Sequence, residues 1–126
     1  MTEPKGELAI RTWAMPADAN PAGDIFGGWL ISQMDIAGGI TGGIRARGRV
    51  ATVAVTGFTF HKPVKVGDVV CCYADIQKVG TTSITIGIEA WVLRRDNPED
   101  RFKVTEGVFT FVALDDDGKK RPVPPA

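Results

Sequence analysis

One stretch constrains the fold more than any other part of this 126-residue chain. From about Gly28 to Ile44 nearly every residue is apolar or small, and these residues repeat at a helical period. The pattern predicts a long helix that is enclosed on most sides, with Asp24 as its N-cap. At about 100° per residue two stripes form: Leu30, Met34, Ala37, Thr41 and Ile44, and Trp29, Ile36 and Ile40.

A third face of this helix carries one carboxylate among glycines. Asp35 stands there with Gly38, Gly39 and Gly42. Each glycine costs about 0.8–1 kcal/mol against Ala in a helix interior, and close approach of another chain or a ligand is the usual reason for accepting it. A charged group on an enclosed helix is rare without a partner or a chemical role. Asp35 is the first candidate for chemistry, and the alternative is a carboxylate that faces solvent or pairs with an Arg.

The composition excludes several classes of protein. The formal net charge is zero, which argues against nucleic acid or an anionic membrane surface as the main partner. No apolar run reaches the roughly 18 residues of a membrane span, and the first residues do not read as a signal peptide. We expect a cytoplasmic protein with one domain over residues 1–126.

Cysteine and histidine are scarce. Cys71 and Cys72 are neighbours on a predicted strand, so their side chains point to opposite faces and do not bridge each other. His61 is the single histidine, and the chain has no CxxC, HExxH or GxSxG motif. The sequence therefore predicts no metal site, and it offers little for a Cys-His pair or a Ser-His-Asp triad.

The rest of the chain reads as strands with short connections. Strands are predicted over 7–14, 50–64, 69–79, 83–95 and 102–114, with a polar loop at 96–100. Gly48 is the predicted stop of the helix, and the tail is extended. These elements predict an α+β fold in which an antiparallel sheet wraps around the helix. Strands that are apolar on both faces in places predict an oligomer.

Simple alternation along the second predicted strand assigns its side chains to two faces. One face is expected to carry Thr52, Ala54, Thr56, Phe58 and Phe60, and the other Ala51, Val53, Val55, Gly57, Thr59 and His61.

Several segments carry a resemblance that spans nearly the whole chain: 12–18, 20–30, 32–35, 63–73, 79–83 and 109–113. The run NPAGDIFGGW at 20–29 is the most specific of them. These segments resemble the hotdog-fold acyl-CoA thioesterases, most closely their small bacterial YciA-type branch. The resemblance implies a hydrolase that releases CoA and a carboxylic acid, with CoA as part of substrate and product and no separate cofactor. It also implies dimers whose sheets join edge to edge and which assemble further, commonly as hexamers.

The resemblance also implies site residues. An Asn in the NxxG loop and an Asp in the helix complete one active site across the dimer interface, and here these are Asn20 and Asp35. Asp35 acts as general base or as nucleophile, and both remain open. Since free amides emerge at a helix start, Gly28 N–H, with Gly27, is expected to polarise the thioester carbonyl. The alternatives are a tight turn at the two glycines and an ordinary Asn-Pro turn.

The anionic CoA nucleotide needs basic and hydrogen-bonding groups. The candidates are Lys62, Lys78 and the turn Gly80, Thr81, Thr82 and Ser83, with Lys119 and Arg121 as weaker ones. His61 is interpreted as structural or as a minor CoA contact, and Glu89 and Glu106 as paired structural carboxylates.

Two other functions compete with hydrolysis. An acyl hydratase on the same fold usually needs a catalytic histidine near the helix, whereas His61 is predicted on a distant strand. A non-catalytic acyl-CoA-binding module would need no carboxylate at Asp35.

Overall fold

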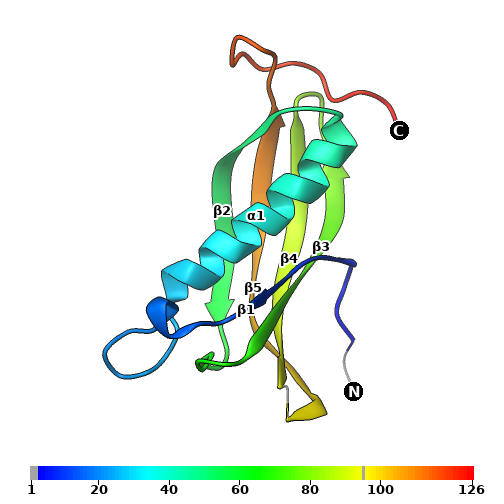
Figure 1. Ribbon diagram of the computed structural model, residues 1–126. Coiled ribbons are helices and arrows are strands. Elements are labelled where there is room, and N and C mark those ends of the chain that lie inside the picture. The colour runs from blue at the N-terminus through cyan, green and yellow to red at the C-terminus, as the bar shows by residue number, and fades with distance from the viewer. Residues whose placement is uncertain (1–2, 95) are drawn as a thin grey trace.

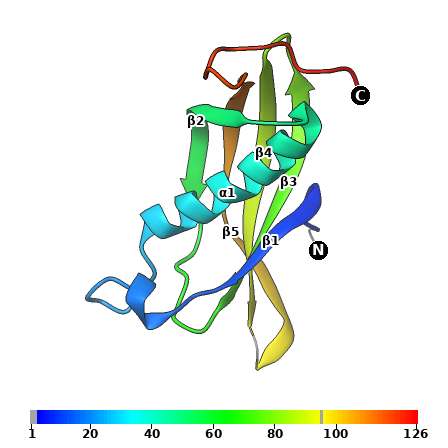
Figure 2. The same cartoon turned by 45° about the horizontal axis from the view of Figure 1, so that its top comes forward.

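The computed structural model describes residues 3–94 and 96–126, which form five strands and one long helix. The sheet has the order β1-β3-β4-β5-β2, and every neighbouring pair is antiparallel. Helix α1 crosses one face of this curved sheet obliquely (Figures 1 and 2). The α+β prediction is confirmed. The elements are β1 (Glu7–Trp13), η1 (Pro16–Asp18), α1 (Gly27–Ala46), β2 (Val50–Phe60), β3 (Val69–Val79), β4 (Ser83–Arg94) and β5 (Asn97–Ala113).

Glycines allow α1 to lie close against the sheet. A Cβ built on Gly38 would stand 2.6 Å from Cζ of Phe111 and 2.7 Å from Cδ1 of Ile88, and both side chains are fully buried. At Gly42 the nearest atom, Cδ1 of Ile86, is 3.5 Å away. Gly38 is therefore explained by packing within the chain, since a side chain there would push the helix off the sheet, whereas a Cβ at Gly42 would make only an ordinary contact.

The N-cap of the helix is not the predicted residue. Phe26 occupies the N-cap position without a side-chain cap, so the assignment of Asp24 as N-cap is wrong. The Asp24 carboxylate instead accepts a hydrogen bond from the Lys65 ammonium group, and the two residues also form a β-bridge. The segment before the helix is thus bound to the β2–β3 connection through Asp24 and Lys65. The helix begins after this segment, at Gly27.

The helix also ends in a different way from the one predicted. Arg47, not Gly48, adopts the left-handed conformation, with φ of 55°. Gly48 donates from its backbone to Gly43 O at 3.1 Å, and a Cβ on Gly48 would stand 2.8 Å from Nη2 of Arg121. Gly48 therefore leaves room for Arg121 rather than supplying the stop.

Two predictions about the strands are wrong. Of the polar loop expected at 96–100, residues 97–100 belong to β5, in which Asn97 already pairs with Arg94. Polar side chains suit this exposed end of the sheet and do not prevent pairing. The second strand ends at Phe60 rather than at Val64, and the predicted end of the fourth, Arg95, lies outside the described residues.

Bulges break the alternation predicted for β2. The register with β5 shifts between Thr52 and Ala54 and again between Thr56 and Thr59. Thr52 precedes the first shift; it pairs with Phe111, and its side chain lies on the helix side of the sheet. β2 is an edge strand, and most of its side chains are exposed. Its outer edge is open for further pairing.

Cys71 and Cys72 do not bridge each other, as predicted; both are free, and both are buried. Burial raises the pKa of the Cys72 thiol to about 12. None of the helices in residues 3–94 and 96–126 combines the length and apolarity needed to cross a membrane.

Replacing Gly38 by Ala is expected to lower the free energy of unfolding by about 1–3 kcal/mol, because buried Phe111 and Ile88 must move. Gly39→Ala is the matched control, since no atom lies within 4 Å of a Cβ there and alanine favours the helix. Urea unfolding of both variants measures the difference. Equal losses from the two variants would contradict this account of the packing.

Candidate active site

The carboxylate of Asp35 is held by a hydroxyl. Asp35 is half-buried on α1, and its Oδ1 accepts a hydrogen bond of 2.5 Å from Oγ1 of Thr52 on β2. Asp35 therefore fits neither alternative considered for it, a carboxylate that faces solvent or one that pairs with an Arg. Sequence reasoning missed the role of Thr52, because alternation gives its face of the strand but not which helix residue it meets 17 positions away. The hydroxyl fixes one carboxylate oxygen, and no donor from residues 3–94 or 96–126 is bound to Oδ2.

Asn20 organises the loop before the helix. Its Oδ1 accepts from the backbone N–H groups of Ala22 at 3.0 Å and Asp24 at 3.1 Å. The loop projects beyond the sheet at the lower left of Figure 1. Within the described part of the chain, no hydrogen bond joins Asn20 to Asp35. Since Oδ1 is already occupied, the group that Asn20 offers to a ligand is its Nδ2 amide donor.

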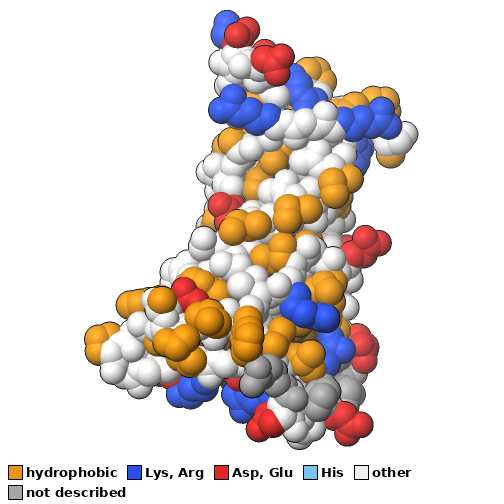
Figure 3. Space-filling model, viewed as in Figure 1, with side chains coloured by type: hydrophobic (Ala, Val, Ile, Leu, Met, Phe, Trp, Pro, Cys, Tyr) orange, Lys and Arg blue, Asp and Glu red, His pale blue; other side chains and the backbone are white. Residues whose placement is uncertain are grey.

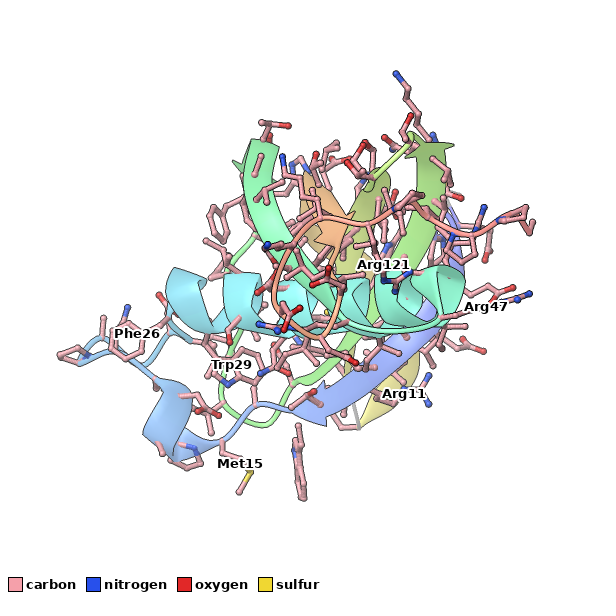
Figure 4. All side chains as sticks on the ribbon, turned by 90° about the horizontal axis from the view of Figure 1, so that it is seen from above. Arg11, Met15, Phe26, Trp29, Arg47 and Arg121 are labelled. Atoms are coloured by element: carbon pink, nitrogen blue, oxygen red, sulfur yellow. The ribbon has the colours of Figure 1, made fainter. Side chains whose placement is uncertain are left out.

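The two glycines are the first residues of α1 rather than a separate turn. The amides of Trp29 and Leu30 donate to Phe26 O at 3.1 and 3.3 Å, so those of Gly27 and Gly28 precede the helical hydrogen bonds. A Cβ on Gly28 would meet no atom within 4 Å, whereas one on Gly27 would stand 3.2 Å from Cζ of Phe60. The Gly28 amide is therefore the more open donor. Phe26 projects outward beside this helix start (Figure 4).

A cleft lies next to the helix start. Its volume is about 320 Å³, and the Lys62 ammonium group, at its rim, stands 4.8 Å from the centre of the Phe102 ring. The cleft thus combines apolar walls with Lys62 and with Gly27, the first residue of α1. Its lining residues are Ile25, Gly27, Leu30, Phe60, Lys62 and Val64, with His61 and Pro63.

The other residues predicted to contact CoA lie at the opposite end of the sheet in the same chain. Exposed Lys78 ends near the β3–β4 turn of Gly80, Thr81, Thr82 and Ser83, beside the C-terminal end of α1 (Figure 1). The Thr81 carbonyl accepts from Val123 N at 2.8 Å and that of Thr82 from Ala113 N at 2.9 Å. One chain therefore does not bring this turn together with Lys62.

An ion network covers the outer face of the sheet. His61 Nε2 lies 2.8 Å from Glu106 Oε2, and Lys103 Nζ lies 3.2 Å from Glu106 and 3.9 Å from Glu89. The hydrogen bond from His61 is the largest cause that lowers the pKa of Glu106. The two glutamates are paired, as expected. No group of three or more His, Cys, Asp and Glu side chains in residues 3–94 and 96–126 could hold a metal ion.

The Arg121 guanidinium group donates hydrogen bonds to backbone carbonyls. Its Nη2 donates to Ala46 O at the end of α1 at 2.8 Å, and its Nε donates to Leu114 O at 2.9 Å. Figure 4 shows Arg121 over the last turn of the helix. A cation there also interacts favourably with the helix dipole. Its guanidinium therefore serves the helix end rather than a phosphate.

The comparisons with known proteins agree with this geometry. Residues 22–98 match the model of the thioesterase superfamily. The chain belongs to this superfamily. Among curated relatives, the acyl-CoA thioester hydrolase YciA of Salmonella typhimurium is 59% identical over 123 residues, which are 96% of this chain and 92% of that protein.

Two solved structures are similar over nearly the whole chain. The hexameric thioesterase y2039 from Yersinia pestis has a TM-score of 0.94 at 59% identity, covering 98% of this chain and 100% of that one. The hexameric hotdog fold thioesterase Cj0915 of Campylobacter jejuni has a TM-score of 0.88 at 38% identity, covering 94% and 91%. The hotdog fold is thereby confirmed.

Replacing Arg121 by Met is expected to lower the free energy of unfolding by about 1–3 kcal/mol, because two charge-assisted hydrogen bonds are lost. Lys119→Met, in the same tail and exposed, should stay within about 0.5 kcal/mol of the wild type. Urea unfolding measures both. An Arg121→Met protein as stable as the control would show that the tail does not hold the helix end.

Proposed function

We propose that this chain is an acyl-CoA thioesterase, which hydrolyses the thioester to free CoA and a carboxylic acid. The observation that carries the proposal is Asp35, a half-buried carboxylate oriented by Thr52 on a helix of a thioesterase-superfamily chain. The relative of 59% identity named above is an acyl-CoA thioester hydrolase. The reaction uses water and the chain's own groups, and CoA enters as part of the substrate.

The active site needs two chains. Asp35 lies seven residues after Gly28, which is roughly 10 Å along a helix. An N–H group that donates to the thioester oxygen must lie about 3 Å from that oxygen. A carboxylate that acts as base must lie about 3 Å from the attacking water. One helix therefore does not offer both groups to one thioester. Asp35 of one chain works with the Gly28 amide and Asn20 of another.

The open edge of β2 is the surface that supplies this second chain. β2 lies at the end of the sheet, and Thr52, the partner of Asp35, stands on it. Two copies that pair along β2 bring two Asp35–Thr52 pairs toward the shared edge. These dimers assemble into hexamers, as the relative y2039 does.

Each group has a defined part in the hydrolysis. The Gly28 amide and the Nδ2 of Asn20 donate to the thioester oxygen as negative charge develops on it. Asp35 either takes the proton of the attacking water through Oδ2 or attacks the carbonyl carbon itself. Thr52 holds Oδ1 and so fixes the carboxylate. Gly27 leaves space for Phe60 at the helix start.

The CoA moiety meets groups at both ends of the sheet. Lys62, at the rim of the cleft, is the candidate cation of the chain that offers Gly28. Lys78, Gly80, Thr81, Thr82 and Ser83 remain candidates that a neighbouring chain contributes. The compartment we propose is the cytoplasm, since both cysteines are free.

The competing functions find less support. A hydratase would need a histidine free to act beside the helix, whereas the ring of His61, which lines the cleft at the helix start, is bound to Glu106. A binding module without catalysis would gain nothing from a carboxylate that a hydroxyl holds in place.

Asp35→Ala and Asp35→Asn are expected to lower the turnover of acyl-CoA by about 10²–10⁴-fold with the fold intact, because the base or nucleophile is lost. Thiol release from a panel of acyl-CoAs measures this, and circular dichroism checks the fold. Turnover at the wild-type level in both variants would refute the role of Asp35.

Mixing the variants tests the shared site. Asp35→Ala and Asn20→Ala chains, each inactive alone, are unfolded together at equal amounts and refolded. Random pairing makes about half of the dimers mixed, each with one intact site, so about a quarter of the wild-type turnover should return. No recovery, with mixed dimers verified by mass spectrometry, would show that each chain completes its own site.

Asn20→Asp is expected to lower turnover at least as much as Asn20→Ala, by about 10²–10³-fold. The aspartate keeps the two bonds to the amides of Ala22 and Asp24 but lacks the Nδ2 donor and adds charge beside the oxyanion. The two variants are compared by kcat. A fully active Asn20→Asp enzyme would exclude the donor role.

A further inference from the structure

The ring of Phe60 forms one wall of the cleft at the helix start. Phe60 is the last residue of β2, it is 51% exposed, and it lines the cleft together with Gly27. A Cβ built on Gly27 would stand 3.2 Å from Cζ of the ring, which is closer than an ordinary side-chain contact. The ring therefore lies tight against the first turn of α1, and a group that enters the cleft meets it.

Other aromatic rings continue from Phe60 into the core. The centre of its ring lies 5.1 Å from that of Phe58. The ring of Phe58 in turn lies 6.2 Å from that of Phe109, which stacks on Phe111 at 6.3 Å. Phe109 and Phe111 are fully buried, and Phe111 lies under Gly38 of α1. Phe60 is thus the outermost ring of a row that fills the space between the cleft and the interior beneath the helix.

The second ring of this row is fixed by the shape of the sheet. At the second register shift, β2 places Gly57 and Phe58 opposite the single residue Gly107 of β5. Gly57 has the left-handed φ of 61°, and a Cβ on Gly107 would stand 2.6 Å from Cδ2 of Phe58. The ring of Phe58 therefore occupies the space that a side chain at 107 would fill. Phe60, which is more exposed, is the ring that limits the depth of the cleft.

Phe60 also borders the place proposed for the thioester. Gly27, against which the ring lies, is followed directly by Gly28, whose amide is the proposed donor. In the proposed pairing of two antiparallel β2 strands, the end of one strand lies beside the beginning of the other. Phe60 of one chain therefore lies on the side where the other chain holds Asp35 through Thr52.

The walls of the cleft are apolar, and its rim is polar. Ile25, Leu30 and Val64 line it beside the ring, and hydrophobic side chains gather at this end of the molecule, at the lower left of Figure 3. The cation of Lys62 stands at the rim. The acyl chain is the part of an acyl-CoA that has no hydrogen-bonding groups, whereas the amides of the CoA arm would lose their water between such walls. The walls therefore suit the acyl chain, and the rim suits the CoA moiety.

We propose that Phe60 sets the length of the acyl chain that this protein accepts. The inference rests on the proposed function and deepens it. From the Gly28 amide, the acyl chain lies along the apolar walls of the cleft and ends against the Phe60 ring, with Phe58 behind it. The favoured substrates are acyl-CoAs whose chains end before this ring. Phe60 takes no part in the chemistry and discriminates between substrates by shape alone.

The test is the binding of a series of acyl-CoAs from acetyl-CoA to decanoyl-CoA, measured by titration calorimetry on Asp35→Ala protein, which leaves the thioester intact. Each buried CH₂ should strengthen binding by about fourfold until the chain reaches Phe60, and longer chains should gain nothing more. With Phe60→Ala added, the gain should continue past that length, so that chains two carbons longer bind at least about tenfold more tightly than to the protein with Phe60. Phe60→Leu should extend the gain by less.

Phe26→Ala is the matched control. Phe26 is 50% exposed, stands beside the same helix start and projects outward (Figure 4), and it does not line the cleft. This variant should keep the chain length at which binding stops improving. Free CoA has no acyl chain, so all of these proteins should bind it with equal affinity.

Two results would overturn the inference. In the first, binding stops improving at the same chain length with and without the Phe60 ring. In the second, free CoA and every acyl-CoA change by the same factor, which would place the CoA arm against the ring. The Phe60→Leu variant gives the same comparison if the alanine variant does not fold. A wild type that binds acyl-CoAs without hydrolysing them would refute the proposed function while the role of Phe60 is still measured, and one that binds none would refute both.

Discussion

The close approach of α1 to the sheet is the constraint on which the rest of the structure depends. Gly38 brings the helix backbone against Phe111 and Ile88, which a larger residue would push away. Because the helix lies this low, Asp35 stands within 2.5 Å of a hydroxyl on the neighbouring strand. The same packing that closes the core therefore sets the position of the carboxylate. A glycine that weakens the helix by itself is compatible with the fold because it creates this contact.

The two ends of the helix are held by segments that are distant in sequence. At the start, Asn20 Oδ1 accepts a hydrogen bond from the backbone N–H of Asp24, and the Asp24 carboxylate accepts one from Lys65. At the end, Arg121 of the tail binds the carbonyls of Ala46 and Leu114. The helix start can thus keep its first amides open, because the preceding loop has its own anchors. In the proposed mechanism these amides and the Asn20 donor meet a carboxylate from another copy.

Much of this structure could be predicted from the sequence. The helical period of the central stretch and the two-residue period after it give the element types, because each element buries one or more faces. The candidates Asp35 and Asn20 came from a charge on an apolar helix and from a specific motif. The role of Thr52 could not be found, since the meeting of its hydroxyl with Asp35 depends on how the helix crosses the sheet. The role of Arg121 was equally hidden, because it reaches a carbonyl 75 residues away.

The position of Thr52 on an edge strand has one more consequence. In the proposed arrangement, the strand that fixes the carboxylate is also the strand on which two copies recognise each other. A newly made chain that has not met its partner therefore carries only disconnected halves of two sites. Such a chain is catalytically silent, and dimerisation itself switches the chemistry on.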